Sequence, residues 1–421
     1  MKQSLQNKPS IWSFRDMRLV IPARAVSFFG DSLALVVLSL EIARSDRPIL
    51  MTLLLVAFSL PMFLLAPVAG RLVDEHDSRA LLVAAGALQV VASLGLVWGP
   101  NPVALLGFVL LLQAGQSVTA PTWGAVVPRI VGDELVGKAV GIQQSLSALA
   151  GLGGAAAGGL LYAAVGYHAS LLIDTCTFAL LVVVGALVRT RRGRRYDADT
   201  SSAPVATVGE EASISGRSVI AGDPLLRLLV PALYLVVLAL EAPNVVEVFL
   251  ITDDFGASAA VYGLVTAAFL LGEIVGPLLA ARISAEASRL VGAAASAGVV
   301  GALIIAIGLS PSVWIVLVLF AACGIAGGML NALIGTLVVT RTPDHVRGRV
   351  LATVGGTARG FAVLAMAIGG LGGQFLGARA TFVICGALGV LAAAMVLRSH
   401  RGLAATATVV DKASPSALQT V

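Results

Sequence analysis

Two acidic residues interrupt long apolar stretches of this chain at matching positions. Asp31 lies midway along the apolar stretch 19–42, and Glu241 lies midway along 226–250, 210 positions later. A carboxylate in apolar surroundings is costly unless it is paired or faces water. A carboxyl group that is partly desolvated can bind and release a proton near neutral pH. We therefore predict that Asp31 and Glu241 carry protons.

Further charged residues lie in other apolar stretches. Arg24 precedes Asp31 by seven positions, which places both on one helix face, so Asp31 could instead be a packing acid bonded to Arg24. Glu273 in 260–281 and Arg359 in 350–375 are the next candidates to face a cavity. For each of these two, a fixed salt bridge between helices is the alternative.

Other polar residues are weaker candidates. Glu247 stands six positions after Glu241, toward the end of its stretch, where an outer mouth would lie. Asp174 opens the stretch 169–188, and an acid at a helix start usually compensates the helix dipole. Gln113 and Asn244 could supply polar contacts to a substrate in a cavity.

The stretches that hold these residues are long enough to cross a membrane. The 421 residues are 58% hydrophobic and only 12% charged, with a mean hydropathy of +0.95, whereas soluble domains carry about 25% charged residues. Each stretch reaches the roughly 20 residues of a membrane-spanning helix and lacks the alternation of a transmembrane strand. We predict an all-α membrane protein with twelve spans: 19–42, 49–70, 78–98, 103–127, 138–163, 169–188, 226–250, 260–281, 289–309, 312–339, 350–375 and 379–398.

The chain is internally duplicated. Four glycines recur 211 positions later: Gly137, Gly158, Gly159 and Gly166 return as Gly348, Gly369, Gly370 and Gly377. The pair Ala169-Ser170 returns as Ala380-Thr381 at the same offset. Duplicated sets of hydrophobic segments are typical of membrane transporters, whose pathway lies between the two repeats.

The duplication and the charges predict the organisation of the chain. Two pseudo-symmetric six-helix halves, 1–188 and 226–398, flank a polar linker, 189–225, and a disordered tail, 399–421, follows. Basic residues gather on one side of the predicted spans, and few fall elsewhere: Arg44, Arg47 and Arg379 on outer connections, and Arg24 and Arg359 within spans. Because basic loops stay in the cytoplasm, we expect a multi-pass protein of the cell's inner (plasma) membrane with the linker, the tail and both termini cytoplasmic.

A short polar segment, 70–79, joins the second and third spans. Gly70 permits a tight turn, and Asp74 could cap the next helix or pair with Arg79 as a latch at the inner mouth. An ordinary solvated turn is the alternative. The segment resembles the Gly-x-x-x-Asp-x-x-x-x-Arg loop of the major facilitator superfamily, at the position that this family requires.

A ladder of glycines lies in the fifth span. Its members match the spacing of the superfamily's antiporter motif, which belongs to exporters more than to uptake systems: Gly141, Gly154, Gly158 and Gly159. Ala150 replaces a glycine, and Ala155 replaces the usual proline and so removes a kink. The resemblance implies that these glycines seal the interface between the halves, and plain helix packing is the alternative.

Two further motifs narrow the resemblance. Phe29-Gly30-Asp31 and Ile173-Asp174-x-x-x-Phe178 look like the branch of macrolide-efflux and enterobactin-exporter-like permeases. This resemblance covers nearly all of 18–398 and implies export of hydrophobic or amphiphilic small molecules, such as drugs, in exchange for protons by alternating access. It also implies a role in multidrug resistance.

Other functions are less well supported. The chain has no phosphate-binding loop and no His/Cys cluster, so we expect no enzyme, no metal and no cofactor. The expected partners are a small-molecule substrate, protons and the lipid bilayer, without nucleic acid, for a protein that is a monomer. Three alternatives stay open: a dedicated exporter of one natural product, such as a siderophore or the cell's own antibiotic, a non-transporting membrane sensor or scaffold, and an ion channel.

Overall fold

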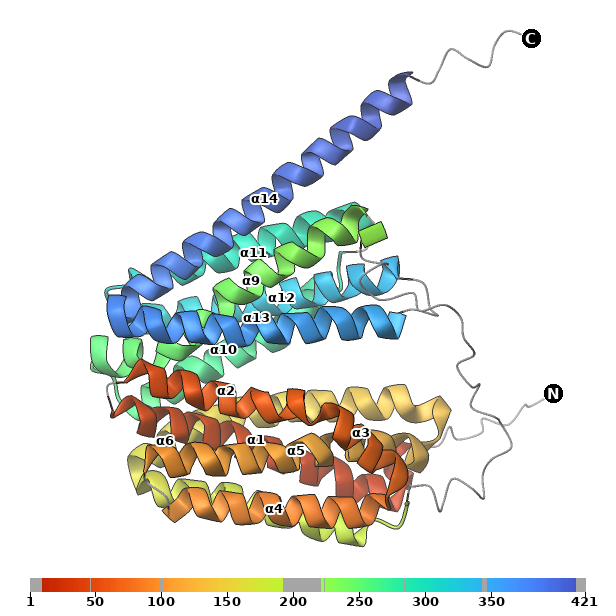
Figure 1. Ribbon diagram of the computed structural model, residues 1–421, viewed down its shortest axis with the longest axis vertical. Coiled ribbons are helices and arrows are strands. Elements are labelled where there is room, and N and C mark those ends of the chain that lie inside the picture. Colours follow the sequence, from red (N-terminus) through yellow and green to blue (C-terminus); the bar gives the residue numbers. More distant parts are fainter. Residues whose placement is uncertain are drawn as a thin grey trace, which may run out of the picture. The chain divides into compact units, whose positions relative to one another are not determined.

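A computed structural model describes residues 10–45, 47–98, 101–191, 221–222, 224–283, 285–342 and 347–413 (Figure 1). Their regular structure is entirely helical. The chain forms two compact units, of which the first comprises 1–209 and 251–267 and the second comprises 210–250 and 268–421. Each unit has its own hydrophobic core, built in the first around Met17, Ile21 and Trp123 and in the second around Leu226, Leu333 and Val350.

The first unit begins with a short 3₁₀ turn, and its helices follow in sequence order. They are η1 (Ile11–Ser13), α1 (Arg15–Ala43), α2 (Pro48–Leu64), α3 (Ala66–Glu75), α4 (Ser78–Trp98), α5 (Pro102–Val131) and α6 (Asp133–Leu187). Helix α1 packs mainly on α6, while α4 packs on both α5 and α6. Residue Asn101 caps α5 by accepting a hydrogen bond from the amide of Val103 at 2.9 Å.

The second unit holds most of the remaining helices. They are α9 (Pro224–Phe249), the single-turn π-helix η2 (Leu250–Asp254), α10 (Ala259–Ala280), α11 (Glu286–Gly308), α12 (Val313–Arg341), α13 (Arg347–Leu376) and α14 (Ala378–Ala413). Residues 251–267, which include most of η2 and the start of α10, belong to the first unit. Helix α9 packs on α13 and α14, and α11 packs on α12 and α14.

The helices reproduce the predicted spans. Ten of them are long and apolar enough to cross a membrane in the described part of the chain, and the pair α2 and α3 forms an eleventh span bent by 48°. Proline cannot continue a helix without losing a backbone hydrogen bond, and Pro61 and Pro67 flank this bend. Helix α6 turns at Gly166, where φ is +79°, and its arms account for the predicted fifth and sixth spans. The prediction of twelve spans in an all-α membrane fold is thereby confirmed.

The internal repeat is visible in the backbone itself. Gly166 and its repeat Gly377 have φ of +79° and +82°, a left-handed conformation that favours glycine, and both lie between two apolar helical segments. One turn later, the hydroxyls of Ser170 and Thr381 each donate to the carbonyl of the respective glycine at 2.8 Å. The duplicated sequence therefore builds the same turn in both units.

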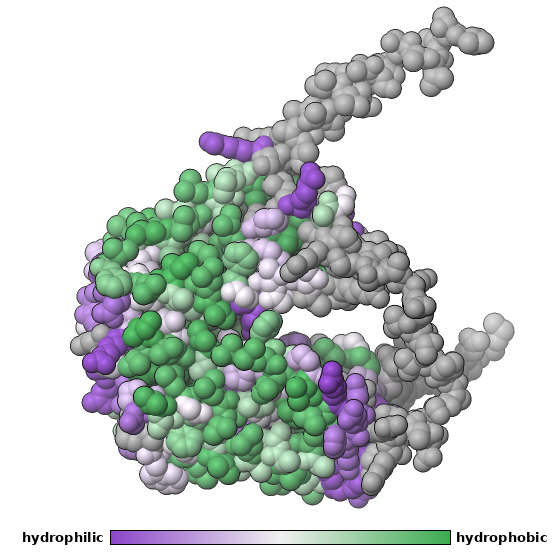
Figure 2. Space-filling model, in the orientation of Figure 1, coloured by the Kyte–Doolittle hydropathy of each residue, from purple (hydrophilic) through white to green (hydrophobic). Residues whose placement is uncertain are grey.

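The helices present apolar side chains outward. On the visible face of α1 to α6, hydrophobic residues cover the middle of the helices and hydrophilic residues gather at both ends (Figure 2). Large side chains near the helix ends are strongly exposed: Trp98, Trp314 and Phe375. Such a surface suits lipid tails in the middle and aromatic contacts at the interface.

The predicted linker and the predicted tail differ in how far the structure describes them. Most of the predicted linker, 189–225, lies outside the described residues, but 189–191 and the start of α9 are described. The tail predicted to be disordered, 399–421, instead continues α14 as a helix to Ala413, and 414–421 lie outside the described residues. Alanine is the strongest helix former, and four alanines in 404–413 explain why the helix continues past the apolar stretch.

Candidate functional site

Asp31 lies on α1 beside a small cavity of the first unit. Two turns earlier on the same helix face, Arg24 lines the same cavity, together with Ser27 and Gln116. The cavity volume of about 20 Å³ is enough for one water molecule. No salt bridge joins Arg24 to Asp31 in the described part of the chain. Asp31 is thus a partly buried acid beside a cavity and is not neutralised by the predicted local pair.

The polar wall of this cavity comes from α5. Gln116 accepts a hydrogen bond from Gln89 Nε2 at 2.8 Å, and the Thr119 hydroxyl lies 3.3 Å from the Gln116 carbonyl oxygen. Gln113, predicted as a cavity contact, is only 8% exposed and does not line this cavity. Gln113 and Gln116 lie three positions apart, so a modest helix rotation decides which one reaches the cavity.

Asp174 lies deep inside the first unit. It follows the Gly166 turn by eight residues and is 1% exposed, so it is not the helix-start residue that the sequence suggests. Its Oδ2 lies 3.4 Å from the Ser93 hydroxyl of α4. Its Oδ1 has no hydrogen-bond partner among the described residues. The predicted capping role is therefore wrong, because the helix begins two turns before this residue.

Glu241 lies on α9 beside a larger cavity of the second unit. The volume of this cavity is about 240 Å³. Asn244, one turn later, donates a hydrogen bond from Nδ2 to Glu241 Oε2 at 3.0 Å, so the predicted polar contact of Asn244 falls on the acid itself. Glu273 of α10 lines the same cavity, and so does Glu247, which the sequence places at an outer mouth.

Aromatic rings complete the wall of this cavity. The ring centroid of Phe320 lies 6.3 Å from that of Phe269 and 6.3 Å from that of Phe382. Apolar walls that carry a few polar groups are typical of small-molecule sites. The cavity thus combines apolar walls with carboxylates and the amides of Asn244 and Asn331.

Arg359 lies on α13 with an exposed side chain and does not line the cavity. Glu273 thus faces a cavity as predicted, and Arg359 does not line that cavity. No salt bridge joins Glu273 to Arg359 in the described part of the chain. The three acids and this cation lie on three different helices, so their grouping depends on tertiary packing.

Side chains of the segment 70–79, next to the start of α4, contact the end of α6 and the residues that follow it. The Arg79 guanidinium donates to the carbonyl of Ala186 near the end of α6. Asp77 accepts a hydrogen bond from the Arg79 amide at 3.0 Å, and its other oxygen lies 3.4 Å from the Arg191 guanidinium. The contacts recorded for Arg79 are thus to Ala186 and Asp77, in place of the predicted partner Asp74.

The glycines of α6 differ in what surrounds them. A Cβ at Gly154 would collide with the backbone carbonyl of Phe29 on α1, and a Cβ at Gly158 would lie 2.9 Å from the carbonyl of Leu33. At Gly159 it would collide with the carbonyl of Ala259 at the start of α10. Nothing lies within 4 Å of the corresponding position at Gly141, and the same is true of Gly70 in the loop motif. Three of the four ladder glycines therefore permit close helix contact.

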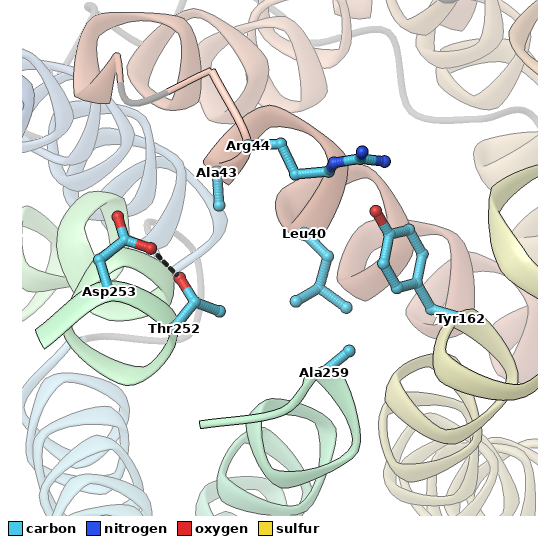
Figure 3. A pocket seen from close by; sticks show the side chains of 7 residues that line it. All are labelled: Leu40, Ala43, Arg44, Tyr162, Thr252, Asp253 and Ala259. Atoms are coloured by element: carbon cyan, nitrogen blue, oxygen red, sulfur yellow. Dashed lines mark hydrogen bonds between the residues drawn. The ribbon is translucent and has the colours of Figure 1, made fainter. Parts of the chain in front are cut away.

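A second large cavity lies at the opposite end of the first unit from the segment 70–79. Its volume is about 300 Å³, with Arg44 and Tyr162 on one side and Thr252 and Asp253 on the other (Figure 3). The Tyr162 hydroxyl donates to Glu41 Oε2 at 2.8 Å, and Arg44 lies 3.7 Å from the same oxygen. The hydrogen bond to Tyr162, followed by the charge of Glu41, raises the pKa of Arg44. Arg44 therefore stays cationic beside this cavity.

A family model described as "Transmembrane secretion effector" matches residues 17–416 of the chain. The match covers both repeats and every membrane-spanning helix. This chain belongs to that family of major facilitator superfamily transporters. The resemblance predicted from the sequence is thus confirmed for the superfamily and for its similarity to the macrolide-efflux branch. The transporter is a multi-pass membrane protein.

Curated relatives of this transporter differ in their described activities. A lysophospholipid transporter of Cronobacter sakazakii is 29% identical over 192 residues, which cover 44% of this chain and 45% of the relative. Macrolide efflux protein A of Streptococcus pyogenes is 29% identical over 31% of this chain and 33% of its own length. A transporter of the same superfamily from Bacillus subtilis is 23% identical over 90% of this chain and 92% of its own. The chain thus matches less than half the length of the lysophospholipid transporter and the macrolide efflux protein.

Solved transporter structures share the fold. A bacterial homologue of the iron transporter ferroportin aligns with a TM-score of 0.66 at 16% identity, over 93% of this chain and all of the other. A D-xylose–proton symporter aligns with a TM-score of 0.67 at 14% identity, over 90% and 96% of the two chains. These identities are low, so the likeness establishes the fold alone.

Two residues of the site are absent from the sequence-based prediction. Gln116 lines the Asp31 cavity, and Arg191 binds the loop motif. Their polar character within or beside apolar spans was visible, but the partner of each depends on how two helices rotate against one another. Among the described residues, no group of three or more His, Cys, Asp or Glu side chains is arranged to hold a metal ion.

Proposed function

We propose that this transporter exports hydrophobic or amphiphilic small molecules in exchange for protons, by alternating access. The observation that carries this proposal is the repeat relation of Asp31 and Glu241. Each is an acid in the first helix of its repeat, and each lines an internal cavity of its own unit. Acids within membrane spans mark proton and ion pathways in pumps and transporters.

The lining of the Glu241 cavity supports an amphiphilic substrate. Phe269, Phe320 and Phe382 offer apolar area, while Glu241 and Asn244 offer hydrogen-bonding groups. A molecule with an apolar body and a few polar groups would satisfy both kinds of wall. The similarity to macrolide efflux protein A favours outward movement of such a molecule.

The coupling follows from charge. With a carboxylate ionised, the cavity offers a negative group to the substrate, and with the carboxyl protonated it does not. Binding of a proton and binding of the substrate therefore oppose each other at the same groups, which is what exchange requires. The transporter would bind a proton on the outer side as the substrate leaves, and release it on the cytoplasmic side as the next substrate molecule binds.

We place the transporter in the inner membrane of the cell. In the proposed orientation, the segment 70–79 and both termini lie on the cytoplasmic side. It is supported by the basic residues at that end, including Arg71, Arg129 and Arg189. Contacts at that end, such as Asp77 with Arg191, would hold the helix ends together in one conformation. The glycines of α6 would let its neighbours approach closely during the transition.

A second candidate function is movement of lysophospholipids. The similarity to the lysophospholipid transporter of Cronobacter sakazakii favours it. A lysophospholipid is itself an amphiphile with one acyl chain, so the same cavity chemistry would apply. The two candidates differ in whether the charged headgroup is required for transport.

The deciding experiment uses the purified full-length transporter in lipid vesicles with a pH-sensitive dye inside. A panel that includes macrolides, lipophilic dyes and a labelled lysophospholipid is added under an imposed pH gradient. We expect at least one compound class to move with a countercurrent of protons and to lose accumulation when a proton ionophore is added. Transport that ignores both the gradient and the ionophore would contradict proton coupling.

The breadth of the panel separates the remaining alternatives. Movement of several unrelated amphiphiles supports a multidrug exporter, whereas movement of one compound supports a dedicated exporter of a natural product. Loss of one secreted compound from a deletion strain would support the dedicated role independently. Absence of any flux across the panel would favour a sensor or scaffold.

A further inference from the structure

Asp174 is a buried acid that the proposed mechanism leaves without a role. It lies on the second arm of α6, eight residues after the turn at Gly166, and its side chain is 1% exposed. An ionised carboxylate at such a position needs several hydrogen-bond donors to offset its desolvation. The number of donors around Asp174 therefore indicates whether it can hold a charge alone.

The contacts of Asp174 are too few for an isolated carboxylate. Its Oδ2 has a single long contact, 3.4 Å from the Ser93 hydroxyl, which also lies 2.8 Å from the Thr175 hydroxyl. Its Oδ1 has no partner within the described chain. The Thr177 hydroxyl donates to the backbone carbonyl of Asp174 at 2.8 Å. Two weakly satisfied oxygens are more compatible with a carboxyl that holds a proton.

The unpartnered oxygen lies against α1 next to Asp31. A Cβ built on Gly30 would lie 2.6 Å from Asp174 Oδ1, so only glycine lets the carboxyl occupy this place. Asp31 is the next residue along α1. Two acids from different helices therefore lie close together inside one unit.

Few other charges face this pair. Arg24 shares the cavity of Asp31 on the same helix. The neighbouring helices α4 and α5 contribute uncharged groups from their described residues: Ser93, Gln89, Gln116 and Thr119. Two carboxylates with so little neutralising charge are strongly disfavoured when both are ionised.

We propose that Asp31 and Asp174 form a carboxyl pair that holds one proton. Asp31 faces the cavity and is the member through which the proton enters and leaves, and Asp174 is the buried member of the pair. Uptake of one proton converts one carboxylate of the pair to the neutral acid, and its release restores the carboxylate. The pair would be the proton-binding site of the first repeat. The role of the pair in export rests on the proposed function. The binding of one proton by the pair does not depend on that function.

The pair is tested by infrared spectroscopy of the full-length transporter in lipid nanodiscs, titrated over pH. We expect the wild-type spectrum to contain a protonated-carboxyl band from the pair that both Asn variants alter. In Asp174→Asn and in Asp31→Asn, the remaining carboxyl has a neutral neighbour, so it binds its proton less tightly. We expect the titration midpoint of that band to move to lower pH by about one unit or more in each variant. Ser93→Ala is the control, because it removes one long contact and no charge.

Export is then measured across pH in vesicles. We expect Asp174→Asn to shift the pH dependence of export in the same direction as the infrared midpoint. Titrations of both Asn variants that superimpose on the wild type would overturn the pair. If Asp174→Asn fails to fold, Asp31→Asn alone decides, because Asp174 is then the group observed. Wild-type vesicles that export nothing while the infrared shift occurs would refute the proposed function and leave the pair intact.

Discussion

The guanidinium of Arg191 lies 3.4 Å from the carboxylate of Asp77, so the segment after α6 is bound to the start of α4. Asp77 precedes Ser78, the first residue of α4, and also accepts a hydrogen bond from the Arg79 amide. One carboxylate therefore caps a helix and binds a distant cation. The side chains of Arg191 and Asp77 are 36% and 29% exposed, which makes the ion pair the weaker of the two contacts.

Substitutions at these two residues should therefore differ in cost. Arg191→Ala removes the exposed ion pair with Asp77, and we expect a loss of less than about 1 kcal/mol. Asp77→Ala also removes the helix cap and should cost about 1–2 kcal/mol. Thermal unfolding of the purified transporter in detergent measures both. Equal losses in the two variants would show that the cap contributes nothing.

The glycines of α6 provide a matched pair of substitutions. Gly154→Ala would force a methyl group into the backbone carbonyl of Phe29, and we expect it to destabilise the first unit by about 1–3 kcal/mol. Gly141→Ala meets nothing within 4 Å and should be neutral or stabilising by up to about 1 kcal/mol, because alanine favours helix. Thermal unfolding and membrane yield report on both. A Gly154→Ala variant as stable as Gly141→Ala would contradict the close packing of α6 on α1.

Hydropathy was sufficient to predict the fold of this chain. The span predicted at 78–98 coincides with α4, and the offset between Gly166 and Gly377 locates the same turn in both repeats. The reason is physical, since a backbone in lipid must satisfy its own hydrogen bonds and does so as helices of predictable length. The bend between α2 and α3 at Pro61 and Pro67 also follows from residue type.

The partners of polar side chains were less predictable. Arg79 was expected to bind Asp74 a few residues away, yet it donates to Ala186 on another helix. Glu273 and Arg359 were both expected to face a cavity, yet Arg359 does not line the cavity that holds Glu273. Each choice depends on the rotation and depth of two helices from different parts of the chain. Apolar patterning leaves both quantities undetermined, since these spans are hydrophobic on all sides.

Asp31→Asn should abolish proton-coupled export and leave the transporter in the membrane. Asparagine keeps the shape of the side chain but cannot bind and release a proton at the cavity. The matched control is Glu75→Gln, which neutralises an exposed acid at the end of α3. Substrate-driven proton release from vesicles measures both variants. Undiminished proton-driven efflux in the Asn variant would remove Asp31 from the mechanism.

Tyr162→Phe should weaken the attachment of α6 to the end of α1. The variant loses a 2.8 Å hydrogen bond to Glu41 and leaves Arg44 as the remaining contact of that carboxylate, so we expect a loss of about 1 kcal/mol. Tyr234→Phe is the control, because Tyr234 stacks on Phe361 at 5.0 Å and its hydroxyl has no recorded partner in the described chain.

A double-mutant cycle with Glu41→Gln isolates the contact of Tyr162 with the charge. If the hydrogen bond stabilises the carboxylate, the sum of the stability losses in the two single variants exceeds the loss in the double variant. The difference, which is the coupling free energy, should be about 0.5–1.5 kcal/mol. Because Arg44 competes for the same oxygen, Arg44→Ala should increase that coupling by leaving Tyr162 as the sole donor from this cluster. Additive losses in the cycle would mean that Tyr162 contributes only its ring, and the cavity in Figure 3 would then lack a fixed polar wall on that side.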